Sequence, residues 1–128
     1  MIYIDTSAVL KLVHTEPESG ALRIWLARHP DDLVSSALVR TESRRALLRN
    51  DPAALPDLPA ILAVIAQIPV TEAVLDQAAT LPDPLLRSLD AIQLASALAI
   101  TGLAAVLAYD KQLADAARSA GLSVASPA

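Results

Sequence analysis

The sequence Ala104-Ala105-Val106-Leu107-Ala108-Tyr109, followed directly by Asp110, decides the fold class. An unbroken apolar run of this length, ended by a charged residue, predicts a β-strand that is buried on both faces. Ile2-Tyr3-Ile4, followed by Asp5, repeats the same pattern near the N-terminus. Strands buried on both faces occur in parallel sheets that helices cover, so the two runs together predict an α/β protein.

Stretches with helical patterning separate these two runs from further short strands. We expect Ser36, Thr71 and Ser88 to cap the helices that follow them, and Gly121 to end the last helix. This alternation of strands and helices predicts a parallel sheet with helices on both faces. The expected helices are Ser7–His14, Glu18–Arg28, Ala37–Arg49, Ala60–Gln67, Glu72–Leu81, Leu89–Thr101 and Lys111–Ala120, and the further strands are Leu33–Ser35, Ile68–Val70 and Ser123–Ala125.

Length and composition predict a single domain, residues 1–128, without covalent crosslinks. The chain has 128 residues, of which 54% are hydrophobic, and no cysteine, so disulfides and thiolate metal sites are excluded. The most apolar stretch, Ala91–Tyr109, is broken by Gly102 and contains polar side chains, which favours a buried helix and strand over a membrane span. We therefore expect a cytoplasmic protein. A net charge of −4 counts against nucleic-acid binding unless the acids hold a metal ion.

Four carboxylates fall where such a fold places its ligands. Asp5 and Asp110 directly follow the two buried strands. Glu42 lies in the helix after the second strand, and Asp90 lies in the first turn of the helix that leads to the Asp110 strand. Open parallel sheets bind ligands at the carboxyl ends of their strands. Gathered carboxylates repel one another by about 3 kcal/mol per pair at roughly 5 Å and a dielectric constant of about 20, and a hard divalent cation relieves this repulsion.

Each acid also has an ordinary structural interpretation. Asp110 can cap the helix that begins at Lys111, Asp90 can favour the dipole of its helix, and Glu42 can pair with Arg45 on the next turn. Taken singly, these alternatives stay open. As a set in an alternating α/β sequence, the four acids favour a metal site.

Four segments of the sequence resemble the PIN domain, and most closely its VapC-like toxin branch. They are Ile2–Ala8, Thr41-Glu42, Ser88–Ala97 and Ala108–Asp110, and in order they cover essentially the whole chain. The resemblance implies a three-layer α/β/α sandwich with a central parallel sheet of four to five strands. It also implies a Mg²⁺- or Mn²⁺-dependent endoribonuclease that a cognate antitoxin neutralises.

The resemblance also carries roles to individual residues. It implies metal-binding and catalytic roles for Asp5, Glu42, Asp90 and Asp110, and it suggests that the hydroxyl of Thr6 or Ser7 assists near the metal. Many members have Thr or Ser two residues before the fourth acid, whereas this chain has Ala108. That departure leaves Asp115 as an alternative fourth acid.

The expected chemistry is metal-assisted hydrolysis of RNA phosphodiester bonds, which leaves a 5′-phosphate and a 3′-hydroxyl. No histidine or lysine is placed as an obvious general base. RNA contact requires cations, and the sequence offers Arg40, Arg44 and Arg87 as the preferred candidates, with Arg45 and Arg49 on the same helix as the first two.

We further expect a homodimer with no membrane association that binds its antitoxin. The apolar side chains between Val9 and Leu26, which include Trp25, either form a docking surface for that partner or face the core. Two rival functions are a catalytically inactive PIN-like protein-binding module, which Ala108 leaves open, and a receiver-like regulatory domain. The receiver requires an aspartate after the third strand, where this chain has Thr71-Glu72.

Overall fold

The computed structural model describes residues 1–128 and contains one five-stranded sheet. The strand order is β3-β2-β1-β4-β5, and every neighbouring pair is parallel. The predicted parallel sheet is therefore confirmed. The strands are β1 (Ile2–Ile4), β2 (Leu33–Ser36), β3 (Ile65–Ile68), β4 (Ala105–Leu107) and β5 (Val124–Ala125).

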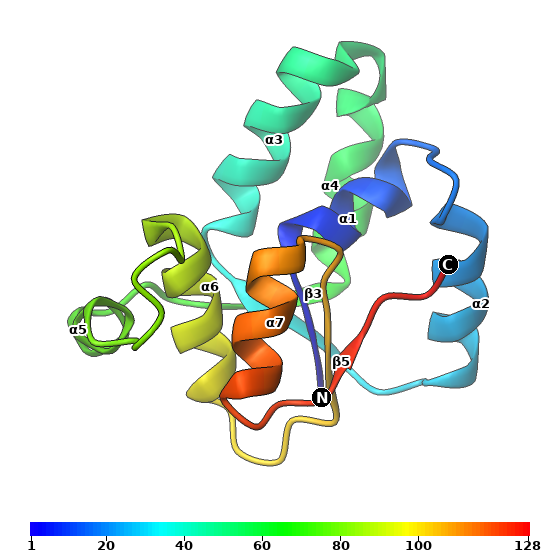
Figure 1. The fold of residues 1–128 in the computed structure, drawn as a ribbon. Helices are drawn as coiled ribbons and strands as arrows, with labels where there is room; N and C mark the ends of the chain where they lie inside the picture. The colour runs from blue at the N-terminus through cyan, green and yellow to red at the C-terminus, as the bar shows by residue number, and fades with distance from the viewer.

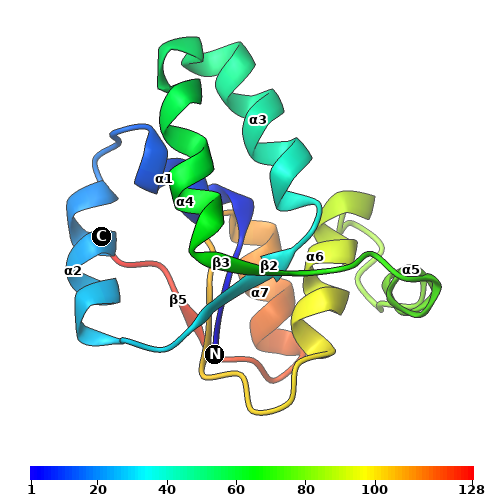
Figure 2. The same cartoon turned by 180° about the vertical axis from the view of Figure 1, so that it is seen from behind.

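Helices cover both faces of this sheet and complete the three layers. Helices α1 to α4 lie on one side, α6 and α7 lie on the other, and α5 packs on the outside of α6 (Figures 1 and 2). The α/β/α sandwich expected from the sequence is confirmed. The helices are α1 (Thr6–Val13), α2 (Ser19–Arg28), α3 (Val39–Asn50), the 3₁₀ helix η1 (Pro52–Asp57), α4 (Leu58–Ala63), α5 (Glu72–Ala79), α6 (Ser88–Leu98) and α7 (Lys111–Ser119).

The central strand β1 explains why two cores form. Successive side chains of a strand point to opposite faces, so Ile2 and Ile4 join a core cluster with Leu22 and Leu47 on the α1–α4 side. Tyr3 points the other way and packs in the cluster of α6 and α7. All three side chains of β1 are essentially inaccessible to solvent. The buried apolar pattern of this strand thus follows from helices on both faces.

Several helix ends are fixed as the sequence predicts. Thr71 caps α5, and its hydroxyl accepts the N–H of Val74. Gly121 has a φ of +91° after α7, where its N–H binds the carbonyl of Arg118. That left-handed conformation suits glycine because it has no Cβ. The caps predicted at Ser36 and Ser88 are wrong. Helix α3 begins at Val39 with Leu38 as its N-cap residue, and α6 begins at Ser88 with Arg87 as its N-cap residue.

The largest error concerns the third strand and the helix before it. The sequence predicts a helix over residues 60–67 and a strand over Ile68–Val70, whereas α4 ends at Ala63 and β3 runs from Ile65 to Ile68. Ile68 is the last residue of the strand, and Pro69 follows it. Proline has no N–H to donate, which explains why the strand ends there rather than beginning.

The apolar stripe between Val9 and Leu26 mainly faces the interior. Val9 and Leu22 are fully buried, and Leu10, Trp25 and Leu26 pack against the same core cluster. The core-facing alternative is therefore the one that the structure supports for these side chains. No helix of the chain combines the length and the apolar character that crossing a membrane requires.

Candidate functional site

The strand order places the site between β1 and β4. The chain runs outward from β1 to β2 and β3 on one side and from β4 to β5 on the other, so the direction of strand succession reverses between β1 and β4. Open sheets of this kind bind ligands at that reversal, at the carboxyl ends of the strands. Asp5 follows β1 and Asp110 follows β4, and the N–H of Asp5 binds the carbonyl of Leu107 at 2.9 Å.

A cleft of about 510 Å³ opens at this position. The structure brings to it all four carboxylates that the sequence selects, two from the segments that follow β1 and β4 and two from α3 and α6. Both hydroxyl residues suggested by the resemblance line it as well. The lining residues are Asp5, Thr6, Ser7, Leu10, Glu42, Arg45, Ala46, Arg49, Leu89, Asp90 and Asp110.

Asp5 is the most buried of the four carboxylates, with only 5% of its surface exposed. It is the N-cap of α1, and its Oδ2 accepts hydrogen bonds from the N–H of Ser7 at 3.2 Å and from its hydroxyl at 2.7 Å. Burial raises the pKa of Asp5 to about 6, and the nearby charge of Glu42 adds to this, although the bonds from Ser7 oppose it. The Asp5 carboxylate therefore carries charge that the protein only partly compensates.

The hydroxyl of Ser7 also connects the two central strands. It donates to Asp5 and accepts the N–H of Tyr109 at 2.9 Å, one residue before Asp110. One side chain thus ties the carboxyl end of β1 to the segment after β4. This contact fixes the two chain segments that supply Asp5 and Asp110.

Glu42 lies in the first turn of α3, and its Oε1 carries the contacts that hold it. The hydroxyl of Thr6 donates to that oxygen at 3.0 Å, and the side-chain amide of Gln93 donates to it at 2.6 Å. Gln93 is 1% exposed, and the sequence analysis does not select it. The signal that could have found it is a lone amide on an apolar helix face, three residues after Asp90.

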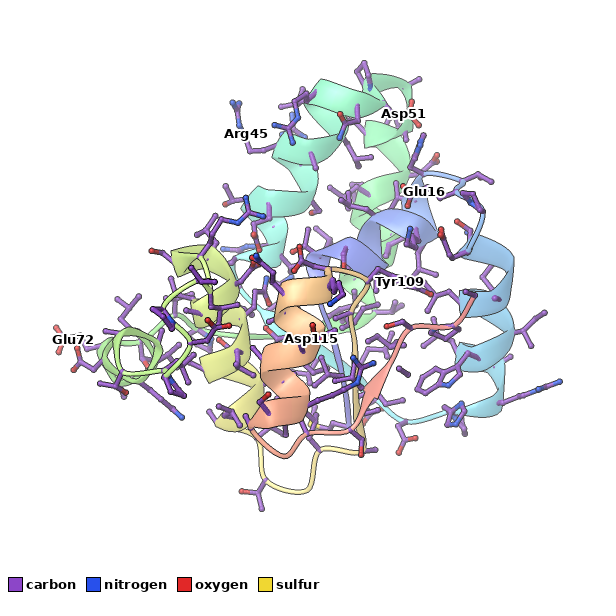
Figure 3. The ribbon with its side chains drawn as sticks, in the orientation of Figure 1. Glu16, Arg45, Asp51, Glu72, Tyr109 and Asp115 are labelled. Atoms are coloured by element: carbon purple, nitrogen blue, oxygen red, sulfur yellow. The ribbon has the colours of Figure 1, made fainter.

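Asp90 and Asp110 complete the acidic lining. Partial burial raises the pKa of Asp90, and the negative charges of Asp110 and Glu42 add to the effect, against the opposing charge of Arg87. The Oδ1 of Asp110 accepts the N–H of Leu113 at 2.9 Å and so caps α7. Asp115 lies on the exposed side of α7 (Figure 3) and does not line the cleft. It pairs there with Lys111 at 3.0 Å.

The arginines of the cleft differ from those that the sequence favours. Arg45 and Arg49, one turn apart on α3, line the cleft, and Figure 3 shows Arg45 extending from this helix into solvent. Arg87 lines an adjoining hollow with Glu42 and Asp90. Arg40 and Arg44 are exposed on α3 but line neither space.

The donor chemistry of the cleft fits a hard divalent cation, because carboxylate oxygens are the ligands that Mg²⁺ and Mn²⁺ prefer. The raised pKa values of Asp5 and Asp90 indicate negative charge that such an ion would compensate. As the side chains stand, no three acids or histidines form a group close enough to hold an ion. An ion would therefore have to draw the carboxylates closer together.

Comparison with known proteins agrees with this geometry. The sequence profile of the PIN domain matches residues 2–119, which include every carboxylate of the cleft. The chain belongs to the PIN-domain family. Within it, the relatives are VapC proteins: Ribonuclease VapC46 of Mycobacterium tuberculosis is 44% identical over 128 residues, which are 98% of this chain and 97% of the relative.

Two further proteins that resemble this chain are also VapC proteins. Ribonuclease VapC35 of Mycobacterium tuberculosis is 39% identical over 131 residues, which are 99% of this chain and 97% of that protein. Among solved structures, the Mycobacterium tuberculosis toxin VapC20, described as cleaving the sarcin-ricin loop, superposes with a TM-score of 0.77. It is 22% identical, and the match covers 95% of this chain and 96% of VapC20, so this likeness supports the fold alone.

Proposed function

We propose that this PIN-domain chain is a metal-dependent endoribonuclease that acts as the toxin of a toxin–antitoxin pair. The observation that carries the proposal is the convergence of Asp5, Glu42, Asp90 and Asp110 on one cleft at the reversal of strand order. The ribonuclease names of its full-length relatives support the same activity. Membership in the PIN family also removes the receiver-like alternative, since β3 is followed by Pro69 and no aspartate.

The four carboxylates would hold one or two Mg²⁺ or Mn²⁺ ions. When bound, such an ion makes a hydrolytic water more acidic and offsets the negative charge that develops on the phosphate. The hydroxyls of Ser7 and Thr6 fix the carboxylates of Asp5 and Glu42 through the hydrogen bonds described above. Neither histidine lines the cleft, so the carboxylates are also the acceptors available for a proton from water.

The arginines at the cleft would bind the phosphate backbone of RNA. Arg45 and Arg49 line the cleft itself, and Arg87 borders Glu42 and Asp90. Arg40 and Arg44 are exposed on the same helix outside the cleft and would contact RNA further from the cleaved bond. Local positive charge of this kind lets a chain of net charge −4 bind a polyanion.

The decisive experiment is cleavage of bulk RNA by the purified protein with EDTA, with MgCl₂ and with MnCl₂. We expect cleavage only with a divalent ion, and 5′-phosphate ends on the products. Asp5→Asn is the matched variant, because asparagine keeps the cap of α1 and removes the charge. Wild-type protein that leaves RNA intact with both ions would instead favour the inactive protein-binding module.

The toxin function further requires an inhibitor, since an unrestrained ribonuclease damages its own host. We propose that a cognate antitoxin covers the cleft with a charged C-terminal segment, and that the chain forms a homodimer. An acidic segment would meet Arg45, Arg49 and Arg87 at the positions where RNA binds. The stripe around Trp25 gives this partner little surface, because most of it faces the core.

A further inference from the structure

A buried chain of hydrogen bonds leads from the sheet to Glu42. The backbone N–H of Ser36, at the end of β2, donates to the hydroxyl of Tyr3 at 3.1 Å. The Tyr3 hydroxyl donates in turn to Oε1 of Gln93, and Nε2 of Gln93 donates to Oε1 of Glu42 at 2.6 Å. Gln93 Nε2 also reaches the hydroxyl of Thr6 at 3.3 Å. The Gln93 amide of α6 thus contacts residues of β1, α1 and α3, and Tyr3 extends the series to β2.

The hydrogen bonds of this series all run in one direction, from Ser36 through Tyr3 and Gln93 to Glu42. The Tyr3 hydroxyl accepts the N–H of Ser36, so its own hydrogen is available for Gln93. Burial raises the pKa of Tyr3 far above its usual range, which keeps the phenol protonated as a donor. Because Oε1 of Gln93 is thereby the acceptor, its NH₂ group must face Thr6 and Glu42. The amide orientation therefore follows from the surrounding groups.

We propose that Gln93, held by Tyr3, is a positioning residue that fixes Glu42 for cation binding. This inference rests on the proposed metal-dependent activity. A glutamate side chain on a helix rotates about several bonds, and ordering it costs conformational entropy. Thr6 and Gln93 both bind Oε1, which orients the carboxylate and leaves Oε2 for an ion in the cleft.

A glutamine meets this requirement in a way that similar residues do not. Methionine would fill the same volume without donors, and glutamate would place a second carboxylate against Glu42. Residues that hydrogen-bond to metal ligands without touching the metal commonly contribute about 10- to 100-fold to metal affinity or activity. We therefore expect the effect of Gln93 to appear in ion binding as well as in turnover.

The test compares Gln93→Met, Tyr3→Phe and the double variant with wild type. Gln77→Met on α5 is the matched control, because Gln77 is exposed and lies outside the cleft. Isothermal titration with MnCl₂ measures ion affinity of the metal-free protein, and RNA cleavage gives kcat and KM. We expect Gln93→Met to lower Mn²⁺ affinity and kcat by about 10-fold or more, with a much smaller change in KM for RNA.

Tyr3→Phe should cause a smaller loss in the same two quantities. In the Gln93→Met background it should cause no further loss, because the two groups act through one hydrogen-bond chain. A purely structural role would lower thermal stability in both variants but leave the Mn²⁺ affinity of the folded protein unchanged. The control Gln77→Met should match wild type in every measurement.

Two results overturn the inference and leave the proposed function intact. One is Gln93→Met that binds Mn²⁺ and cleaves RNA like wild type, and the other is independent, additive losses from the two substitutions. If Gln93→Met does not fold, Tyr3→Phe decides alone, and wild-type Mn²⁺ affinity in that variant overturns the inference. Wild-type protein that neither binds Mn²⁺ nor requires a divalent ion overturns the proposed function and this inference with it.

Discussion

Asp5 shows how one residue can serve the fold and the site together. As the N-cap of α1 it accepts the N–H of Ser7, and it also lines the cleft, where we propose that its charge binds a metal ion. The hydroxyl of Ser7 donates to the same carboxylate, so the cap and the site share one hydrogen-bond arrangement. A capping role therefore does not argue against a functional one, and the same holds for Asp110.

The raised pKa of Asp5 predicts how the metal-free protein responds to pH. The folded-state value of about 6 lies above the ordinary value of 3.8, so the folded protein retains the proton over that range while the unfolded chain loses it. The contribution of Asp5 to the free energy of unfolding is therefore largest below pH 4. It falls as the pH rises through 6, by up to about 3 kcal/mol. In EDTA, Asp5→Asn should unfold at a higher temperature than wild type at pH 7.

The same variant separates stability from activity. Asp5→Asn, and likewise Asp90→Asn, should lose RNA cleavage while circular dichroism shows an intact fold. The advantage of Asp5→Asn in unfolding temperature should shrink at pH 4, where the folded wild type is already protonated at this residue. A variant that is less stable than wild type at pH 7, or fully active, would contradict the charge assigned to that carboxylate.

Asp110 and Asp115 test the position of the fourth acid. Asp110 lines the cleft and caps α7, whereas Asp115 pairs with Lys111 and Arg118 on the exposed side of that helix. We expect Asp110→Asn to remove most RNA cleavage with little loss of stability, because asparagine caps helices as well as aspartate does. Asp115→Ala should keep both activity and stability, since exposed ion pairs contribute little. The opposite ranking in a cleavage assay would show that Asp115 is the metal-binding acid.

At the scale of elements, the sequence predicts what patterns of hydrophobicity and caps encode. The buried apolar strands β1 and β4, α5 with its Thr71 cap and the glycine stop after α7 are all predicted, because each depends on neighbours in sequence. The boundary between α4 and β3 is not, since Ile61–Ala66 is a continuous apolar stretch without a turn residue. Hydrophobicity alone does not distinguish the end of a buried helix from the start of a strand there.

The direction of side chains on an element is equally hard to predict. The sequence places five arginines near acids, but only the packing of α3 shows that Arg45 and Arg49 line the cleft while Arg40 and Arg44 do not. Gln93 is missed for the same reason, because its partners Tyr3, Thr6 and Glu42 lie 51 or more residues away. Contacts between distant elements depend on the assembled fold.

The arginines of α3 yield a prediction about RNA binding. In a catalytically inactive Asp5→Asn background, Arg45→Ala and Arg49→Ala should each weaken RNA binding and reduce the slope of log affinity against log salt by about 0.7. Arg87→Ala should behave similarly, and Arg40→Ala and Arg44→Ala should have smaller effects. Fluorescence anisotropy at several salt concentrations measures all five. Equal effects of Arg40→Ala and Arg45→Ala would show that RNA follows the outer face of α3 instead.

At the scale of the molecule, strand order explains why residues far apart in sequence share one cleft. The carboxyl ends of β1 and β4 lie side by side, so Asp5 and Asp110 meet although 105 positions separate their numbers. From sequence alone, Asp90 can join them only if its helix begins at the same edge of the sheet. The structure shows that α6 does begin there, since Asp90 and Leu89 line the cleft.

The proposed homodimer is testable from mass alone. Size-exclusion chromatography with light scattering should give twice the 13.4 kDa of one chain at micromolar concentration. The same measurement on Asp5→Asn should give the same mass, because that substitution changes only the cleft and leaves the rest of the protein surface unaltered. A mass of one chain for both proteins would rule out a stable homodimer and leave the nuclease proposal untouched.

The toxin proposal makes its strongest prediction in living cells. Because uncontrolled RNA hydrolysis stops growth, induced expression of this chain alone in its native host should arrest growth, and Asp5→Asn should not. Co-expression of the proposed cognate antitoxin should restore growth, and that protein should co-purify with the chain. Arg45→Ala with Arg49→Ala should weaken that complex if an acidic segment of the partner occupies the cleft, since those two side chains would lose their ionic contacts. Harmless expression of a chain that cleaves RNA with Mg²⁺ or Mn²⁺ in vitro would instead indicate a nuclease that works without an antitoxin.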